Sequence, residues 1–175
     1  SQIAALMPEA LCLPGQPLIR QWMTLLARTS RSIPRNADWV FASSKGEIDL
    51  FEKYMRTDGK LPGDFGIRQT LSELKKIWSF EKDGTFLSSA CTSSMTAIAY
   101  AAKMIRMGKK DSLMVLTADA ITPFIFSGFS SLAALDPEPA RPFDKERKGL
   151  PLGDSAGYSL LMKRENAWKE NRTIP

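Results

Sequence analysis

The chain has 175 residues, of which 43% are hydrophobic and 25% are charged, and its formal net charge is +5. This composition is that of a soluble globular domain that can bury a core, and it excludes disorder over most of the chain. Lysine and arginine are spread among aspartate and glutamate, with no zinc-ligand spacing and no basic-aromatic RNA-binding pattern. We interpret the positive charge as a solvated surface.

Two cysteines, Cys12 and Cys91, are too few for a disulfide framework in a chain of this size, so a reducing cytoplasm is the expected location. The first 13 residues have some apolar character, but they lack a basic leading region and contain Glu9, so we expect no signal peptide. No apolar run approaches the roughly 18 residues of a membrane span.

Apolar periodicity predicts the elements of the first half of the chain. They are an amphipathic helix at 17–29, a buried strand at 39–42 with a turn at 43–46, helices at about 48–55 and 67–78, and a loop at 57–66.

The second half begins with a strand at 85–90, followed by Cys91 and by the cap-type residues Thr92, Ser93 and Ser94. The run 95–107 is rich in alanine and methionine and apolar nearly all round, which predicts a buried helix. A continuous apolar strand follows at 113–116, so the unit is strand, helix, strand and the sheet is expected to be parallel. Further along, we expect a proline-rich loop at 136–142, a last strand at 159–162 and an exposed polar segment at 163–172.

Cys91 thus stands at the carboxyl end of a strand and the N-terminus of a helix, where sites form in open α/β sheets. The unpaired N–H groups and the helix dipole favour the thiolate there, and the same N–H groups can form part of an oxyanion hole. The small neighbours at 88–90 and 92–94 leave room for a substrate. The alternative is a buried cysteine acting as a small apolar residue.

Ser155 is a second candidate nucleophile, because residues 153–157 read Gly-Asp-Ser-Ala-Gly and match the nucleophile elbow of α/β-hydrolases. Its context is poor, since no hydrophobic strand precedes it and a strand rather than a helix is expected after it. We prefer a turn that leads into the last strand. The sequence contains no histidine, which removes the usual base from both candidates. Either the base lies on another segment or the protein only binds.

Several segments in fixed order resemble β-ketoacyl-acyl-carrier-protein synthases over residues 88 to about 172. They are Ser89-Ala90-Cys91-Thr92-Ser93 with the small-residue helix after it, Asp119-Ala120-Ile121-Thr122-Pro123 with Gly128-Phe129, Arg141-Pro142-Phe143-Asp144-Lys145-Glu146-Arg147 with Gly149, and Gly153-Asp154-Ser155-Ala156-Gly157.

The resemblance implies an α/β fold of the thiolase-like class, with a mixed, mostly parallel sheet and a buried helix after the nucleophile strand. Residues 1–175 are then a single N-terminal thiolase-like domain, a fragment of a longer protein of two similar halves. Cys91 is the implied nucleophile of a decarboxylative Claisen condensation, while two catalytic histidines and a lysine lie in the second half. Alone, this chain is expected to be inactive.

Partners implied by the resemblance are acyl carrier protein or acyl-CoA thioesters and a second copy of the chain in a homodimer. No cofactor and no metal ion are implied. Phe124, Phe126 and Phe129 are expected near the substrate channel or the interface, and ordinary core aromatics are the alternative.

The chain departs from the family at Ser155, where glycine is typical, at Leu150-Pro151, and at Ala133, where some members carry an arginine for carrier docking. The first strand of the family is not evident. A non-catalytic, chain-length-factor-like partner or binding module is the alternative function, although such partners usually replace the cysteine. A hydrolase that uses Ser155 is a distant third.

Overall fold

The computed structural model describes residues 4–5, 15–30, 33–57 and 66–172. Its described strands are β1 (Ala4–Ala5), β2 (Asp38–Ala42), β3 (Thr85–Leu87), β4 (Ser112–Asp119), β5 (Leu152–Gly153) and β6 (Ser155–Met162). Its described helices are α1 (Leu18–Thr29), α2 (Ile48–Arg56), α3 (Ile67–Ile77), α4 (Ser93–Arg106), α5 (Pro123–Ser131) and α6 (Arg164–Lys169).

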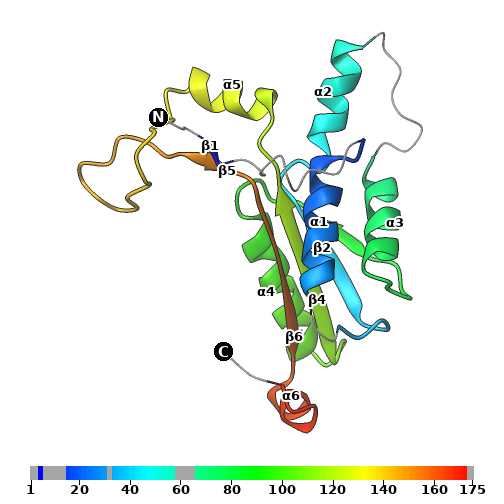
Figure 1. Cartoon of the computed structure of the whole chain (residues 1–175). Helices are drawn as coiled ribbons and strands as arrows, with labels where there is room; N and C mark the ends of the chain where they lie inside the picture. The colour runs from blue at the N-terminus through cyan, green and yellow to red at the C-terminus, as the bar shows by residue number, and fades with distance from the viewer. Residues whose placement is uncertain (1–3, 6–14, 31–32, 58–65, 173–175) are drawn as a thin grey trace.

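Four strands form one sheet in the order β3-β2-β4-β6 (Figure 1). Strand β2 pairs in parallel with β3 on one side and with β4 on the other, and β6 closes the sheet antiparallel to β4. The short strands β1 and β5 form a separate parallel pair. The predicted mixed, mostly parallel sheet is therefore confirmed, and β2 lies between the two strands that flank α4 in the sequence.

Helices cover both faces of this sheet, and the alternating side chains of β2 divide the core between them. Trp39 and Phe41 pack in the cluster that contains α1 and α3, whereas Val40 and Ala42 pack in the cluster that contains α4. Figure 1 shows α1 and α3 on one side of the sheet and α4 on the other. A strand buried on both faces reads as a continuous apolar run, which is why periodicity of two is absent here.

The helices predicted before Cys91 all form, with bounds within about two residues of those expected. Residues 58–65 of the predicted loop lie outside the described residues. The strands differ more, because their ends are set by pairing: the strand expected at 85–90 ends at Leu87, and the one at 113–116 spans 112–119. The strand expected at 159–162 begins at Ser155, since its pairing with β4 continues to Asp119.

Helix α4 follows the strand of Cys91 as predicted, but it is not buried all round. Its buried residues lie four apart on one face: Ser93, Ala97, Ala101 and Ile105. The opposite face carries exposed apolar side chains, with Met95 71% and Ile98 43% exposed. One sheet can cover only one side of a helix, so an apolar surface remains open. None of the described helices is long and apolar enough to cross a membrane.

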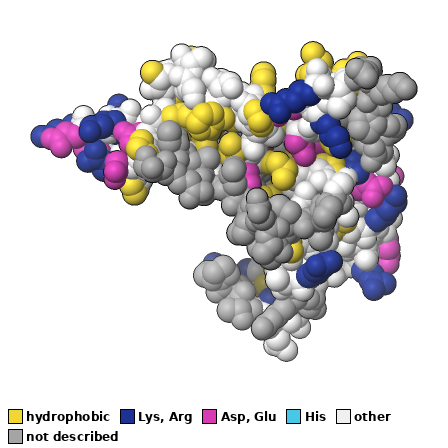
Figure 2. Space-filling view, turned by 45° about the horizontal axis from the view of Figure 1, so that its top comes forward, with side chains coloured by type: hydrophobic (Ala, Val, Ile, Leu, Met, Phe, Trp, Pro, Cys, Tyr) yellow, Lys and Arg dark blue, Asp and Glu magenta, His cyan; other side chains and the backbone are white. Residues whose placement is uncertain are grey.

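A second feature of the shape is the segment that leaves the body after β4. Helix α5 and the loop at 136–151 project to one side of the sheet (Figure 1). Figure 2 shows hydrophobic side chains gathered beside this projection and charged side chains at the far end of the loop. Phe124 and Leu132 in and after α5 are 62% and 75% exposed. The projecting part therefore presents apolar surface that the sheet does not cover.

Trp39 fixes the turn that leads into β3. Its ring stacks on Phe80 at a centroid distance of 5.0 Å, and its Nε1–H donates to the Lys82 carbonyl at 2.9 Å. A Cβ placed on Gly84 would lie 2.4 Å from the Trp39 ring, so only glycine fits at that position. The start of β3, and with it the approach to Cys91, is therefore set by contact with a core side chain.

A buried ion pair joins α1 to the turn after β2. Arg20 donates to both carboxylate oxygens of Glu47, at 2.5 Å from Nε and 2.8 Å from Nη2, and both residues are buried. Burial raises the pKa of Glu47, and the hydrogen bonds and charge of Arg20 oppose that rise only in part. The pair thus holds the turn at the carboxyl end of β2 against α1.

We predict that Arg20→Met lowers the free energy of unfolding by about 3–5 kcal/mol, because Glu47 stays buried without its cation. The double variant Arg20→Met with Glu47→Leu should recover most of that loss. In Arg20→Met, the free energy of unfolding should rise as the pH falls from neutral. Burial holds the pKa of Glu47 in the folded state above its value in the unfolded state, so protonation of Glu47 favours the folded state. Urea denaturation at two pH values measures both effects, and equal stability of the two variants would contradict the prediction.

Candidate active site

Cys91 lies on the tight turn between β3 and α4, and it is exposed to solvent. The residue before it, Ala90, has a φ of 47°, in the left-handed region that a residue with a Cβ seldom adopts. Such a conformation costs about 1–3 kcal/mol and persists only where neighbouring groups hold it. The turn that presents the thiol is therefore strained, as is common at functional sites.

Hydroxyl groups hold this turn. The Ser93 hydroxyl accepts from the Ser89 N–H at 2.9 Å and donates to the Ala90 carbonyl at 2.6 Å. The Thr92 hydroxyl donates to the Ser89 carbonyl at 2.7 Å and lies 3.0 Å from the Ser89 hydroxyl. These bonds tie both ends of the turn together around Cys91, so its backbone has little freedom to relax.

The cap-type residues act differently from what their sequence suggests. Thr92 is the N-cap of α4, but it makes no side-chain cap bond, because its hydroxyl is turned back to Ser89. Ser93 is buried and serves the turn rather than the helix. The first turn of α4 begins beside Cys91 without a side-chain cap, which keeps the positive end of the helix next to the thiol.

The carboxyl ends of β2, β3 and β4 meet at the same rim of the sheet as this turn. Asp119, at the end of β4, accepts from the Ser43 hydroxyl at 3.0 Å and from the Ser44 N–H at 3.0 Å and hydroxyl at 2.5 Å. The Ser88 hydroxyl donates to the Ser44 carbonyl at 3.3 Å. Sequence reasoning missed this network, although polar residues directly after two neighbouring apolar strands were a usable signal.

The three predicted aromatic residues, Phe124, Phe126 and Phe129, all lie in α5, which starts from this rim. Thr122 stands at the N-cap position of α5 but makes no side-chain cap bond. Instead, Glu52 of α2 accepts the Phe124 N–H at 2.7 Å, which places a carboxylate at the helix N-terminus. Phe124 is exposed, while Phe126 and Phe129 are half-buried. Their expected place near a substrate channel or interface stays a prediction.

Ser155 is not on a nucleophile elbow. It is the first residue of β6 and pairs with Asp119, and the strand continues to Met162 rather than turning into a helix. Before it, Asp154 accepts the Ile121 N–H at 2.6 Å and so binds the segment to the end of β4. The Gly-Asp-Ser-Ala-Gly motif therefore serves strand pairing, and the expected turn is largely part of the strand.

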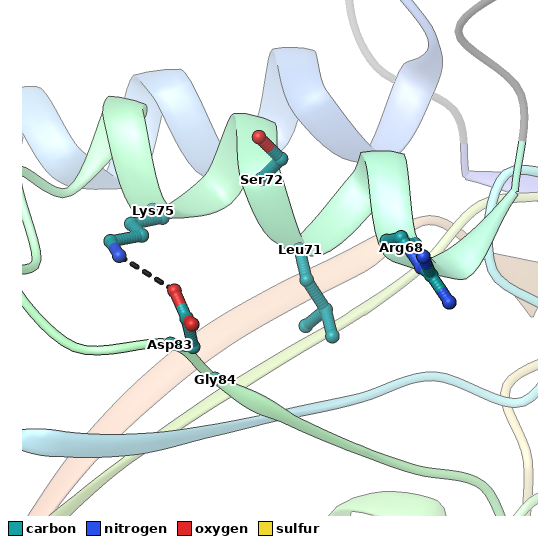
Figure 3. A pocket seen from close by; sticks show the side chains of 6 residues that line it. All are labelled: Arg68, Leu71, Ser72, Lys75, Asp83 and Gly84. Carbon is teal, nitrogen blue, oxygen red and sulfur yellow. Dashed lines mark hydrogen bonds and ion pairs between the residues drawn. The ribbon is translucent and has the colours of Figure 1, made fainter.

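A surface pocket of about 390 Å³ lies at the other end of β3, between α3 and the turn that contains Asp83 and Gly84 (Figure 3). Its cationic side chains are Arg68 and Lys75, and Lys75 is bound to Asp83 at 2.6 Å. The pocket is at the amino end of β3, whereas Cys91 follows the carboxyl end. The described residues contain no cluster of three or more histidine, cysteine, aspartate or glutamate side chains able to hold a metal ion.

Comparison with known families agrees with this geometry. Residues 84–167, which run from just before β3 to α6, match the model of the β-ketoacyl synthase N-terminal domain. This part of the chain belongs to the β-ketoacyl synthase family. It is 40% identical over 88 residues to 3-oxoacyl-[acyl-carrier-protein] synthase 2 of Vibrio cholerae, an alignment that covers 46% of this chain and 21% of that protein.

Solved ketosynthase structures share the fold over most of the chain. AntDE:AntF, a type II polyketide acyl carrier protein in complex with its ketosynthase, has a TM-score of 0.76 at 18% identity, and the match covers 98% of this chain and 49% of that one. The ishigamide ketosynthase/chain length factor has a TM-score of 0.70 at 21% identity, covering 89% and 44%. The fold is thus thiolase-like, and the chain spans about half the length of these ketosynthases.

We predict that iodoacetamide alkylates Cys91 faster than Cys12 in the folded chain, because Cys91 is exposed beside an uncapped helix N-terminus. A fluorophosphonate, which reports activated serine, should leave Ser155 unlabelled. Peptide mapping by mass spectrometry measures both reactions in one sample, with Cys91→Ala as the control. Slower labelling of Cys91 than of Cys12 would contradict an activated thiol, and labelling at Ser155 would restore the hydrolase hypothesis.

Proposed function

We propose that this chain carries the nucleophile of a β-ketoacyl synthase-type acyltransferase, acting in fatty acid or polyketide-type biosynthesis. The observation that carries the proposal is the exposed Cys91 on a strained, hydroxyl-bound turn between a strand and a helix. The match to the β-ketoacyl synthase N-terminal domain spans that whole unit. We propose that residues 1–175 form one N-terminal domain of the thiolase-like type and that it works in the cytoplasm.

In the first step, the Cys91 thiolate would attack the carbonyl carbon of an acyl thioester on a carrier protein or coenzyme A. The new bond joins the acyl carbon to Sγ, the old carbon–sulfur bond breaks, and the released thiol takes up a proton. N–H groups in the first turn of α4 would stabilise the negative charge that develops on the carbonyl oxygen. A carrier protein as the donor is supported by the Vibrio cholerae relative, an acyl-carrier-protein synthase by name, and by AntDE:AntF, in which a ketosynthase binds its carrier protein.

The second step would be decarboxylation of a malonyl thioester. Loss of CO₂ leaves a carbanion that attacks the acyl carbon on Cys91 and releases the thiolate. Stabilising that carbanion needs polar or acidic groups at the thioester oxygen, for which histidine is the residue implied by the family. This chain has no histidine. We therefore propose that the second step depends on a further half that packs near Cys91.

The uncovered face of α4 supports such a half. Apolar side chains of Met95 and Ile98 are exposed on the helix that begins directly after the nucleophile. Large apolar patches on a soluble protein mark surfaces that another unit covers. A second half packed there would bring its own residues close to the N-terminus of α4, which is where Cys91 lies.

We predict that the chain alone forms no β-ketoacyl product from acyl and malonyl thioesters, while Cys91 is slowly acylated by the acyl thioester. Acylation needs only the thiolate and the N–H groups on this chain, whereas condensation needs groups that it lacks. Intact-mass spectrometry detects the acyl adduct, and Cys91→Ala is the matched control that should show none.

Product formed by the isolated chain would contradict the split site. Product that appears only when a histidine-bearing second half is added would support it. An unacylated Cys91 in a folded chain would instead contradict the enzyme proposal as a whole.

We also propose that the protein is a homodimer. Among the described strands, β3 pairs with β2 alone, so its other edge carries backbone groups that a second copy could pair. In this chain without a second half, the exposed apolar residues of α4 and α5 add further surface whose burial between two copies would be favourable.

We predict that this chain self-associates in solution. Light scattering at increasing protein concentration should show a mass above that of one chain, and Met95→Lys with Ile98→Lys should reduce the association by charging the open face of α4. A monomer at every concentration would contradict the prediction.

A non-catalytic partner of the chain-length-factor type is the second candidate. One observation fits it: among the solved structures that share the fold is the ishigamide ketosynthase/chain length factor. A partner of this type would bind a ketosynthase without using Cys91. The acylation experiment separates the two, because only the enzyme proposal requires an adduct at that residue.

A further inference from the structure

The turn that carries Cys91 is well bonded within itself, and α4, which packs on the sheet, anchors its far end. Its internal bonds join Ser89, Ala90, Thr92 and Ser93 to one another. Strand β3, which leads into it, has three residues and pairs with β2 alone among the described strands. An edge strand has a ladder on one side only, so contacts beyond the ladder help to set where the strained turn lies.

Two contacts reach this end of β3 from the end of β2. The Ser43 N–H donates to the Leu87 carbonyl at 3.4 Å, and the Ser88 hydroxyl donates to the Ser44 carbonyl at 3.3 Å. Both involve the Ser43–Ser44 pair, directly after β2, whose residues lie in the core clusters on both faces of the sheet. The position of the Cys91 turn therefore depends on where Ser43 and Ser44 lie.

Asp119 fixes that pair. One of its carboxylate oxygens accepts from the Ser43 hydroxyl and from both the N–H and the hydroxyl of Ser44, and the other lies 3.2 Å from the Ser44 N–H. Bonds to a charged acceptor are the stronger kind. Its own backbone is held by β4, which pairs with β2 on one side and with β6 on the other. Asp119 thus connects the rigid centre of the sheet to the residues that hold β3.

We propose that Asp119 is a positioning residue, which holds the Cys91 turn in its strained, reactive geometry through Ser43 and Ser44. The proposal rests on the proposed function in one respect, the role of Cys91 as the nucleophile. Asp119 touches neither Cys91 nor the acyl group. It acts by keeping the turn, and the N–H groups at the start of α4, aligned for a thioester carbonyl.

The test compares Asp119→Ala, Asp119→Asn and a matched control, Asp38→Ala. Asp38 is also a carboxylate at a strand end of the same sheet, bound to Lys82 at 3.1 Å and Lys110 at 2.7 Å, but it lies at the opposite, amino end. Asparagine keeps the oxygen that accepts from Ser43 and Ser44, so it should rescue the effect. Thermal unfolding of each variant reports any general loss of stability.

Two readouts follow the turn and the thiol separately. In Asp119→Ala, amide hydrogen exchange of the segment 86–94 should quicken by about tenfold while that of α1 and α3 stays unchanged. Acylation of Cys91 by an acyl thioester should fall by about tenfold, while alkylation by iodoacetamide, which needs no aligned N–H groups, stays within about twofold. Asp119→Asn and Asp38→Ala should resemble the unchanged chain in both readouts.

A folded Asp119→Ala with unchanged exchange at 86–94 would overturn the proposal, as would an Asp38→Ala that alters Cys91 to the same extent. If Asp119→Ala does not fold, Ser88→Ala carries the test. This variant removes the hydrogen bond from the exposed Ser88 hydroxyl to the Ser44 carbonyl. Unchanged hydrogen exchange of the segment 86–94 in Ser88→Ala would also overturn the proposal. Hydrogen exchange does not depend on chemistry at Cys91. An unacylated Cys91 in the unchanged chain would therefore count against the proposed function and leave the positioning proposal to be decided by exchange.

Discussion

The parallel pairing of β2 with both β3 and β4 is the constraint on which the rest of the structure depends. Strand β2 is covered by α1 and α3 on one face and by α4 on the other. A backbone buried in this way has no water to bond, so its N–H and carbonyl groups must be satisfied by neighbouring strands. Because both neighbours run parallel to it, three carboxyl ends arrive at one rim, and the polar residues that follow each strand meet there.

The candidate site is a consequence of that rim. Cys91 follows β3, a short strand at one edge of the sheet, and its turn is strained at Ala90. Hydroxyl groups close the turn internally, while Asp119 and the Ser43–Ser44 pair set its place on the sheet. Ser155 shows the contrast, because it begins a strand that pairs along its whole length and has no turn to present its hydroxyl. The reactivity of such a motif depends on the strand, turn and helix around it rather than on its amino-acid sequence alone.

The uncovered apolar surface and the missing histidine have one explanation in the proposed function. Helix α4 presents small residues to the sheet and larger apolar ones, such as Met95 and Ile98, to the outside. A helix apolar nearly all round is stable when two layers enclose it, and the structure provides one. In that proposal, the chain supplies a thiol and helix N–H groups for acyl transfer, whereas the groups that stabilise a carbanion would come from the layer on the open side.

Local sequence determined the element types, because apolar spacing decides which face of a segment can be buried. It predicted the helix before β2, a strand before Cys91 and the helix after it, and the ordered motifs from Ser89 to Gly157 indicated the family. The sequence could not show that β6 begins at Ser155, since strand ends are set by pairing with β4. It could not show that only one face of α4 is covered, because that depends on how many layers pack against it. The bonds from Asp119 to Ser43 and Ser44 join residues about 75 positions apart. Only the folded sheet, by bringing parallel strand ends to one rim, decides such a contact.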